Sequence, residues 1–284
     1  MKRMYLVVVL AIFSQVLSAQ SQAFKVEVVG KGQPILLIPG YSCSGEVWKE
    51  TVNHLKDRFE LHVFTLAGFA DVEPIESDTI LQDERDAIIK YVKENNLKKP
   101  MLIGHSLGGF MILWLQSLEP DLFGESIIVD AVPFISAIND SKVTEQSVKD
   151  NPQFEKATVI ANFESLPNEG YIDQMTAAMR YQVRDTVRAR KIAEWSFESD
   201  RKTLGSTIVE MSTTDLREEI AKIKAPILIL ASTFGTAENS TQIYNEQYAK
   251  LPNKTIKVAD SLHFIMYDQP EWFYIEIDQF LTAN

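Results

Sequence analysis

Short apolar runs recur along the chain, separated by turns and by stretches with helical spacing. Residues 24–30 (FKVEVVG) alternate apolar and polar positions, which predicts a strand with one exposed face. The other strand candidates are continuous apolar runs, as expected for strands covered on both faces of a sheet. They are PILLIPG (34–40), LHVFTLAGF (61–69), MLI (101–103), SIIVD (126–130), PILILA (226–231) and KTIKVA (254–259).

Helical patterns lie between several of these runs. The spacing of apolar residues predicts helices over residues 46–56, 79–94 and 107–118. The third is apolar on every side through FMILWL, which is typical of a helix packed into the core. Strands that alternate with helices indicate an α/β fold, with a mostly parallel central sheet flanked by helices.

About ninety residues between SIIVDAVPF and APILILA contain no good strand pattern. This stretch is polar, with scattered large apolar residues, and it is too long for a loop inside a compact domain. We therefore expect a helical cap, residues 134–213, inserted after the strand that ends at Asp130. The core would then comprise residues 24–133 and 214–284.

The first 23 residues have the composition of an export signal. Lys2 and Arg3 form a basic start, an apolar stretch covers residues 5–13, and small residues occur between positions 18 and 23. The apolar stretch is short for a membrane span. We expect this signal peptide to be cleaved, without stable membrane insertion, which leaves a periplasmic or secreted protein.

The chain is acidic, and this narrows the choice of partners. Its net charge is −11, and it becomes −13 once Lys2 and Arg3 are removed with the signal. Such a charge disfavours nucleic acid and favours a small or medium-sized substrate that is uncharged or cationic. No spacing of His, Cys or Glu matches a metal site, and no glycine-rich motif matches a nucleotide site, so we expect neither a metal nor a cofactor.

The segment GHSLGG places Ser106 between Gly104 and Gly108, after a strand and before a buried helix. A serine raised on such a sharp turn needs small neighbours, because side chains at positions 104 and 108 would collide with nearby backbone. This is the arrangement of a nucleophile elbow. The first N–H groups of the following helix are free to stabilise an oxyanion.

A nucleophilic serine needs a base, and the chain has four histidines. His54 and His62 occur early, where packing roles are expected, and His105 would point away from its neighbour Ser106. His263 lies after the last strand, in a loop that opens on the same sheet edge as Ser106. We expect His263 to act as the general base.

With these motifs the chain resembles proteins of the α/β-hydrolase fold superfamily across nearly all of its mature length. LLIPGYSCSGEVW resembles the family's L-x-H-G strand and loop, TLAGFAD resembles its D-x-x-G-x-G segment, and GHSLGG is its elbow. The resemblance implies an oxyanion hole formed by the backbone N–H groups of Tyr41 and Leu107. Pro39 replaces the histidine usual in that loop, which leaves these main-chain donors in place.

The sequence does not determine which residue is the acid of the expected triad. The family usually carries an aspartate a few residues beyond PILIL, where this chain has Gly235. Asp130, at the end of the strand that follows the elbow helix, is the favoured acid, since some branches of the family place theirs there. Glu238 is the alternative acid, and Asp260 is close to His263 in sequence. Glu238 would need a rebuilt loop, and a short local loop rarely gives an acid such as Asp260 the required approach to the imidazole.

These residues predict a serine hydrolase that cleaves an ester or related acyl bond of a small molecule through an acyl-enzyme. The same fold also serves aminopeptidases, thioesterases and carbon–carbon bond hydrolases. An aminopeptidase would need acids of the cap, such as Glu164, Glu169 and Asp173, to converge on the substrate amine. A ligand-binding receptor without catalysis is the alternative from another class.

Overall fold

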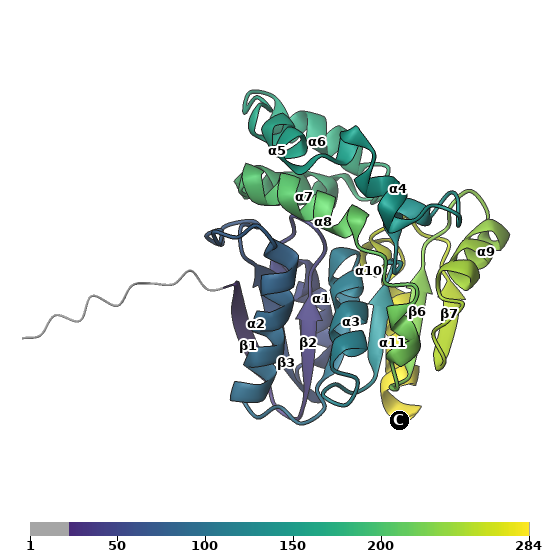
Figure 1. Cartoon of the computed structure of the whole chain (residues 1–284). Helices are drawn as coiled ribbons and strands as arrows, with labels where there is room; N and C mark the ends of the chain where they lie inside the picture. Colours follow the sequence, from purple (N-terminus) through teal and green to yellow (C-terminus); the bar gives the residue numbers. More distant parts are fainter. Residues whose placement is uncertain (1–22, 284) are drawn as a thin grey trace, which may run out of the picture.

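The computed structural model describes residues 23–283, so the predicted signal peptide lies outside the described residues except for Ala23. Within this range, helices pack on both faces of a central sheet, and a further group of helices lies over one edge of it (Figure 1). None of the helices between residues 23 and 283 has the length and hydropathy that a membrane span requires.

The sheet contains seven strands in the order β1-β3-β2-β4-β5-β6-β7. β1 runs antiparallel to β3, and all other neighbouring strands are parallel, which confirms the predicted mostly parallel sheet. The antiparallel direction of β1 could not be read from its alternating pattern. The strands are β1 (Phe24–Gly30), β2 (Gln33–Ile38), β3 (Phe59–Leu66), β4 (Met101–His105), β5 (Ser126–Val129), β6 (Ile227–Ala231) and β7 (Lys254–Val258).

Two of the predicted helices are present almost to the residue, as α2 (Ile80–Glu94) and α3 (Leu107–Leu118). The single helix predicted over residues 46–56 is instead a 3-10 turn, Gly45–Trp48, followed by α1 (Lys49–Leu55). The change of helix type occurs where the Lys49 N–H bonds to the carbonyl of Glu46, three residues earlier. The remaining core helices are α9 (Ala237–Gln247), α10 (Ile265–Asp268) and α11 (Pro270–Ala283).

The strand predicted over residues 61–69 begins two residues earlier and ends three residues earlier than expected, at Leu66. Gly68 and Ala70 have positive φ angles of 73° and 47°, in the left-handed region. A strand cannot continue through this backbone conformation, so the apolar residues after Leu66 belong to a buried turn.

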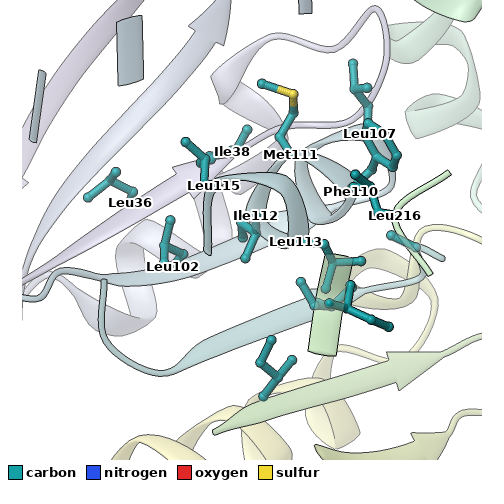
Figure 2. Close-up of a cluster of buried hydrophobic side chains, with 14 of the residues drawn as sticks. Leu36, Ile38, Leu102, Leu107, Phe110, Met111, Ile112, Leu113, Leu115 and Leu216 are labelled. Carbon is teal, nitrogen blue, oxygen red and sulfur yellow. The ribbon is translucent and has the colours of Figure 1, made fainter. Parts of the chain in front are cut away.

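Helix α3 is embedded in the larger of the two main apolar clusters (Figure 2). Phe110, Met111 and Leu115 are almost completely buried, and Leu36 and Ile38 of β2 belong to the same cluster. Apart from Leu118 at its end, which is 52% exposed, the helix has no exposed large apolar side chain, as its sequence predicted. Its packing fixes the turn that precedes it.

Five helices lie between β5 and β6 in the chain and cover the carboxyl edge of the sheet in Figure 1. They are α4 (Glu145–Lys149), α5 (Lys156–Glu164), α6 (Tyr171–Met179), α7 (Thr186–Glu198) and α8 (Arg201–Thr213). We call this group the cap. Its exact limits, residues 134 and 213, stay a prediction.

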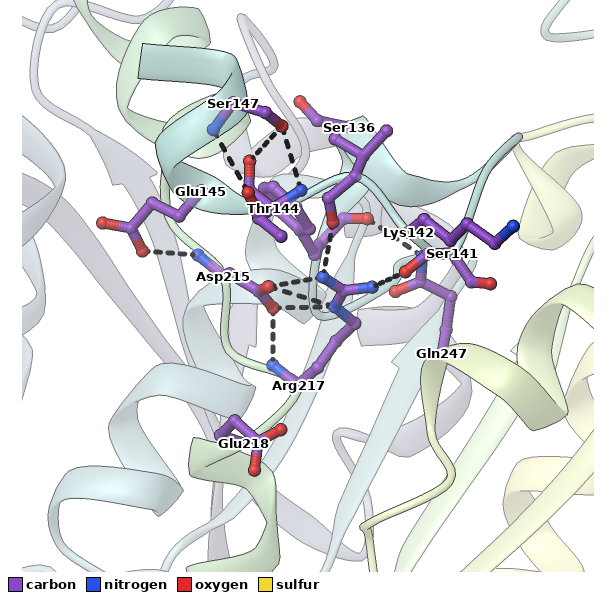
Figure 3. Close-up of polar contacts among 12 residues, drawn as sticks. Ser136, Ser141, Lys142, Thr144, Glu145, Ser147, Asp215, Arg217, Glu218 and Gln247 are labelled. Carbon is purple, nitrogen blue, oxygen red and sulfur yellow. Dashed lines mark hydrogen bonds and ion pairs between the residues drawn. The ribbon is translucent and has the colours of Figure 1, made fainter. Parts of the chain in front are cut away.

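Polar contacts join the two chain segments that lead into and out of the cap (Figure 3). The Arg217 guanidinium pairs with Asp215 at 2.6 Å and donates to the carbonyls of Ser141 and Val143, both at 2.8 Å. The Ser136 hydroxyl donates to the carbonyl of Ser212 at 2.8 Å. These contacts hold the ends of the insertion side by side.

Candidate active site

Ser106 lies on the turn between β4 and α3 in a strained backbone conformation. Its φ angle is 52°, which is rare for a residue with a side chain. A Cβ atom on Gly108 would lie 2.1 Å from the carbonyl oxygen of Ile38, and one on Gly104 would lie 2.4 Å from the carbonyl oxygen of Gly108. Both glycines are therefore required by the close backbone approach around Ser106.

Asp130 follows β5 at the same sheet edge and contacts the predicted base. Its Oδ2 lies 2.5 Å from Nδ1 of His263. The same oxygen accepts a hydrogen bond from the Ser232 hydroxyl at 2.8 Å. Its Oδ1 accepts from the Ser232 N–H at 2.6 Å and from the Tyr244 hydroxyl at 2.7 Å. Four donors thus surround this carboxylate, which is 4% exposed.

These contacts keep Asp130 charged inside the protein. Burial raises the pKa of Asp130, but the hydrogen bonds from His263, Tyr244 and Ser232 outweigh it, so the pKa lies below the usual aspartate value. Burial and the charge of Asp130 raise the pKa of Tyr244 well above its usual value, so this hydroxyl remains a donor.

Ser232 and Tyr244 were not foreseen from the sequence. Ser232 directly follows β6, the strand after which the family usually carries its acid, and this position was its only signal. Tyr244 lies on α9, 114 residues from Asp130, and no local pattern indicates their contact.

The other candidate acids lie elsewhere. Glu238 is exposed in the first turn of α9, and no hydrogen bond in the described chain joins it to His263. Asp260 pairs with Arg184 at 3.0 Å and is exposed. Among the three carboxylates considered, Asp130 is the one that the structure brings to His263.

Ser106 and His263 line the same cavity, together with Asp130. No hydrogen bond joins Ser106 to His263 within residues 23–283, and such contacts often tighten only when substrate binds. The cavity has a volume of about 70 Å³. The other lining residues are largely apolar: Phe110, Ala131, Val132, Ile135, Ile138, Met211, Phe234 and Tyr244. The hydroxyl of Tyr244 is occupied, because it donates to Asp130.

His105 supports the loop that carries His263. Its Nε2 lies 3.1 Å from the carbonyl oxygen of His263, and the two rings are 4.6 Å apart. Burial and the nearby His263 hold the pKa of His105 well below its usual value, so the ring is neutral and Nε2–H donates to that carbonyl. His54 and His62 form polar contacts with other residues: His54 with Asp278 at 2.9 Å, and His62 with the Tyr91 hydroxyl on α2 at 2.7 Å.

The expected oxyanion donors flank the serine. Leu107 is the first residue of α3, so its N–H has no acceptor within the helix. Tyr41 follows Gly40, where an added Cβ would lie 3.3 Å from Cβ of Ser106, so this loop lies against the serine. The Tyr41 hydroxyl donates to the carbonyl of Leu204 in the cap at 2.9 Å. Among residues 23–283, no cluster of three or more His, Cys, Asp or Glu side chains could hold a metal ion.

A serine on a strained strand-to-helix turn and a histidine held by a buried carboxylate, at the carboxyl edge of a mostly parallel sheet, define a hydrolase of α/β architecture. The chain belongs to the alpha/beta hydrolase family, whose family model matches residues 35–276. This confirms the resemblance noted in the sequence and the assignment of the chain as a hydrolase.

Relatives of the chain act on esters and lactones. A pimeloyl-acyl-carrier-protein methyl ester esterase of Aliivibrio fischeri is 23% identical over 90% of this chain and 96% of its own. The 3-oxoadipate enol-lactonase 1 of Acinetobacter baylyi is 21% identical over 80% of each chain. A solved enol-lactonase from Burkholderia xenovorans matches with a TM-score of 0.74 and 15% identity over 91% of this chain and 96% of that one, which shows the shared fold. Ester hydrolysis is the general reaction that the named relatives support.

Proposed function

We propose that the protein is an exported serine hydrolase that cleaves small-molecule carboxylic esters through Ser106, His263 and Asp130. The observation that carries this proposal is the buried Asp130–His263 pair, which opens on the same cavity as the strained Ser106. The relatives that act on esters and lactones support the same reaction.

In the first half of the reaction, Ser106 Oγ attacks the ester carbonyl carbon while Nε2 of His263 takes the hydroxyl proton. Asp130 accepts the hydrogen bond from Nδ1–H, which fixes the tautomer and stabilises the imidazolium. The backbone N–H groups of Tyr41 and Leu107 donate to the negative oxygen of the tetrahedral intermediate. The intermediate collapses, and His263 returns its proton to the departing alcohol.

In the second half, water attacks the acyl-enzyme and gives a proton to His263. The second tetrahedral intermediate expels Ser106, which recovers that proton, and the carboxylic acid leaves. Every proton that His263 takes is returned within the cycle, and no cofactor takes part.

The cavity supports a small apolar acyl group. A volume of about 70 Å³ is about twice the share of one water molecule in the liquid, so the acyl group that fits is small. The carbon-rich lining favours a short hydrocarbon chain and disfavours a charge. The cap acids that an aminopeptidase would need, Glu164, Glu169 and Asp173, are all exposed, and none of them lines this cavity.

A fluorophosphonate label followed by mass spectrometry tests the nucleophile. We expect the label on Ser106 and no label in Ser106→Ala, whose turnover should fall by about 10³-fold or more. A series of p-nitrophenyl esters should show the highest kcat/KM for acetate to butyrate. Labelling at another residue, or undiminished turnover in Ser106→Ala, would rule out the mechanism.

Export is tested separately by N-terminal sequencing of the protein recovered from the periplasm or the medium. We expect a mature chain that starts between positions 19 and 24, after one of the small residues that follow the apolar stretch. Protein that keeps Met1 and remains in the cytoplasmic fraction would contradict export, without bearing on the reaction.

A further inference from the structure

The guanidinium of Arg201 in the cap has two shielded nitrogen atoms without a hydrogen-bond acceptor in the described part of the protein. Nη1 and Nη2 of Arg201, the first residue of α8, are shielded from solvent and have no hydrogen-bond partner in the described chain. No ion pair among residues 23–283 includes this guanidinium. The neighbouring Asp200 forms no ion pair with it within the described residues, and its Oδ1 accepts from the N–H and the hydroxyl of Thr203, both at 2.7 Å. A guanidinium is always charged, and burying it without an acceptor is costly.

The aromatic rings near Arg201 supply no hydrogen-bond acceptor for its Nη1 and Nη2 atoms. Its central carbon lies 3.9 Å from the centre of the Tyr171 ring and 6.0 Å from that of Phe197. The Tyr171 hydroxyl is already joined to the Ser196 hydroxyl at 2.9 Å. Contact with an aromatic face uses the charge of an arginine but not its N–H groups, which lie in the guanidinium plane. The planar edge matches the two oxygens of a carboxylate.

Arg201 lies on the same part of α8 as the contact between the cap and Tyr41. The Tyr41 hydroxyl donates to the carbonyl of Leu204 at 2.9 Å, and Leu204 is three residues, about one helical turn, from Arg201. Tyr41 follows β2, on one side of Ser106 in the strand order. The acyl cavity is built on the other side, from residues after β5 and β6 such as Val132 and Phe234.

Helix α8 links the two regions. Met211 lines the acyl cavity, and Arg201 is ten residues earlier on the same helix, a separation of about 15 Å along its axis. The two substituents of an ester diverge from its carbonyl carbon. When the acyl group occupies the cavity, the alcohol portion points to the side of Tyr41 and Arg201.

We infer that Arg201 binds a carboxylate carried by the alcohol portion of the substrate, several bonds from the ester. This inference rests on the proposed function and adds a substrate class: esters that join a small apolar acyl group to a chain with an anionic end. An anionic substrate differs from the uncharged or cationic one expected from the net charge. The guanidinium of Arg201 acts at short range, whereas the negative charges on the surface are screened by salt.

The test compares two series of acetate esters. One series is the ω-acetoxy carboxylates with 6 to 12 carbons, and the other is the corresponding primary amides, which keep the shape and lack the charge. For one chain length, we expect kcat/KM of the carboxylate to exceed that of the amide by about 10- to 100-fold, mainly through KM. Arg201→Met keeps an apolar side chain against Tyr171 and should bring the ratio close to one. Arg201→Lys, which keeps the charge without the planar edge, should give an intermediate ratio.

Arg188 provides a matched control. It also lies in the cap and 3.9 Å from a tyrosine ring, that of Tyr267, but its guanidinium pairs with Glu50 at 2.9 Å. Arg188→Met should leave the carboxylate-to-amide ratio unchanged. Hydrolysis of the amide series shows that each variant is folded, since that reaction does not use Arg201.

The possible failures are distinguishable. If wild-type protein hydrolyses the amide series but shows no preference for carboxylates, or if Arg201→Met keeps the preference, Arg201 is only a packing residue and the inference is wrong. If no ester is hydrolysed, the proposed function is wrong. Calorimetric titration of Ser106→Ala with decanedioate then still tests the site, because binding needs no chemistry. Binding that persists equally in the Ser106→Ala/Arg201→Met double variant would overturn the assignment.

Discussion

The Asp130→Asn substitution tests the proposed triad through the tautomer of His263. An asparagine can present either its oxygen or its NH₂ group at the position of Oδ1. Two donors face that position: in the wild type the Ser232 N–H lies 2.6 Å and the Tyr244 hydroxyl 2.7 Å from Oδ1 of Asp130. An NH₂ group in that position would face two donors without an acceptor, so the amide oxygen must take it. The NH₂ group is then directed at Nδ1 of His263.

An imidazole that accepts a hydrogen bond at Nδ1 carries its proton on Nε2. Nε2 is the atom that must take the proton of Ser106, so this tautomer cannot act as the base. We expect kcat/KM for a neutral short-chain ester to fall by about 10⁴-fold, which corresponds to about 5.5 kcal/mol of transition-state stabilisation. The fold should survive, because the substituted side chain would keep the hydrogen bonds from the Ser232 N–H and the Tyr244 hydroxyl.

The assay is steady-state hydrolysis of p-nitrophenyl acetate, together with thermal unfolding of each variant. Glu238→Gln is the matched control, because Glu238 is an exposed acid close in sequence to the position where the family usually has one. Its kcat/KM should stay within about twofold of wild type. If folded Asp130→Asn retained more than about a tenth of the wild-type kcat/KM, Asp130 would not orient the base. A large loss in Glu238→Gln would assign that role to Glu238.

Two further predictions concern stability. Gly108→Ala should lower the free energy of unfolding by about 3 kcal/mol or more, because its Cβ would lie 2.1 Å from a backbone oxygen. Gly235→Asn, at a φ of 74° with open space around it, should change that free energy by less than about 1 kcal/mol. Equal shifts of the unfolding temperature in the two variants would contradict the prediction. Burial, with the charges of Glu210 and Asp83, raises the pKa of Glu84 well above the usual value, so the folded state keeps a proton that the unfolded state loses as the pH rises above about 4.3. The free energy of unfolding of the wild type should therefore fall relative to that of Glu84→Gln by up to about 1.4 kcal/mol per pH unit between pH 5 and 7. If urea titrations gave the same difference between the two proteins at every pH, the raised pKa of Glu84 would be refuted.

The parts of the fold that could be predicted are those that local pattern determines. The continuous apolar runs of β2, β4, β5 and β6 were predictable as strands, because a strand covered on both faces must be apolar throughout. The helix of residues 107–118 was predictable because it is apolar on all sides and begins directly after a glycine-rich turn. The end of β3 was misjudged because Ala67 and Phe69 are as apolar as strand residues, although they are buried in a turn.

The contacts that could not be predicted join residues far apart in sequence. Arg201 and Tyr171 are separated by thirty positions, and Tyr244 and Asp130 by more than a hundred. A cation on an aromatic ring and a hydroxyl on a carboxylate leave no periodic trace in a chain. Only the tertiary packing of the helices that carry Arg201, Tyr171 and Tyr244 reveals these contacts.

The position of the acid follows from the parallel sheet. β5 and β6 are neighbours with Val129 opposite Leu230, so the residues that follow the two strands emerge side by side at the same edge. Adjacent strands are about 4.8 Å apart, a distance that one carboxylate side chain and a small loop shift can cover. An acid after either strand can therefore reach the histidine loop, and for that reason the sequence alone left the choice open. In this chain the residue after β6 is Ser232, whose N–H and hydroxyl both donate to Asp130. The residue after β6 thus supplies two of the donors that hold the acid. Ser232→Ala removes the hydroxyl donor and leaves Asp130 in place, so we expect kcat/KM to fall by about 10-fold, a smaller loss than in Asp130→Asn.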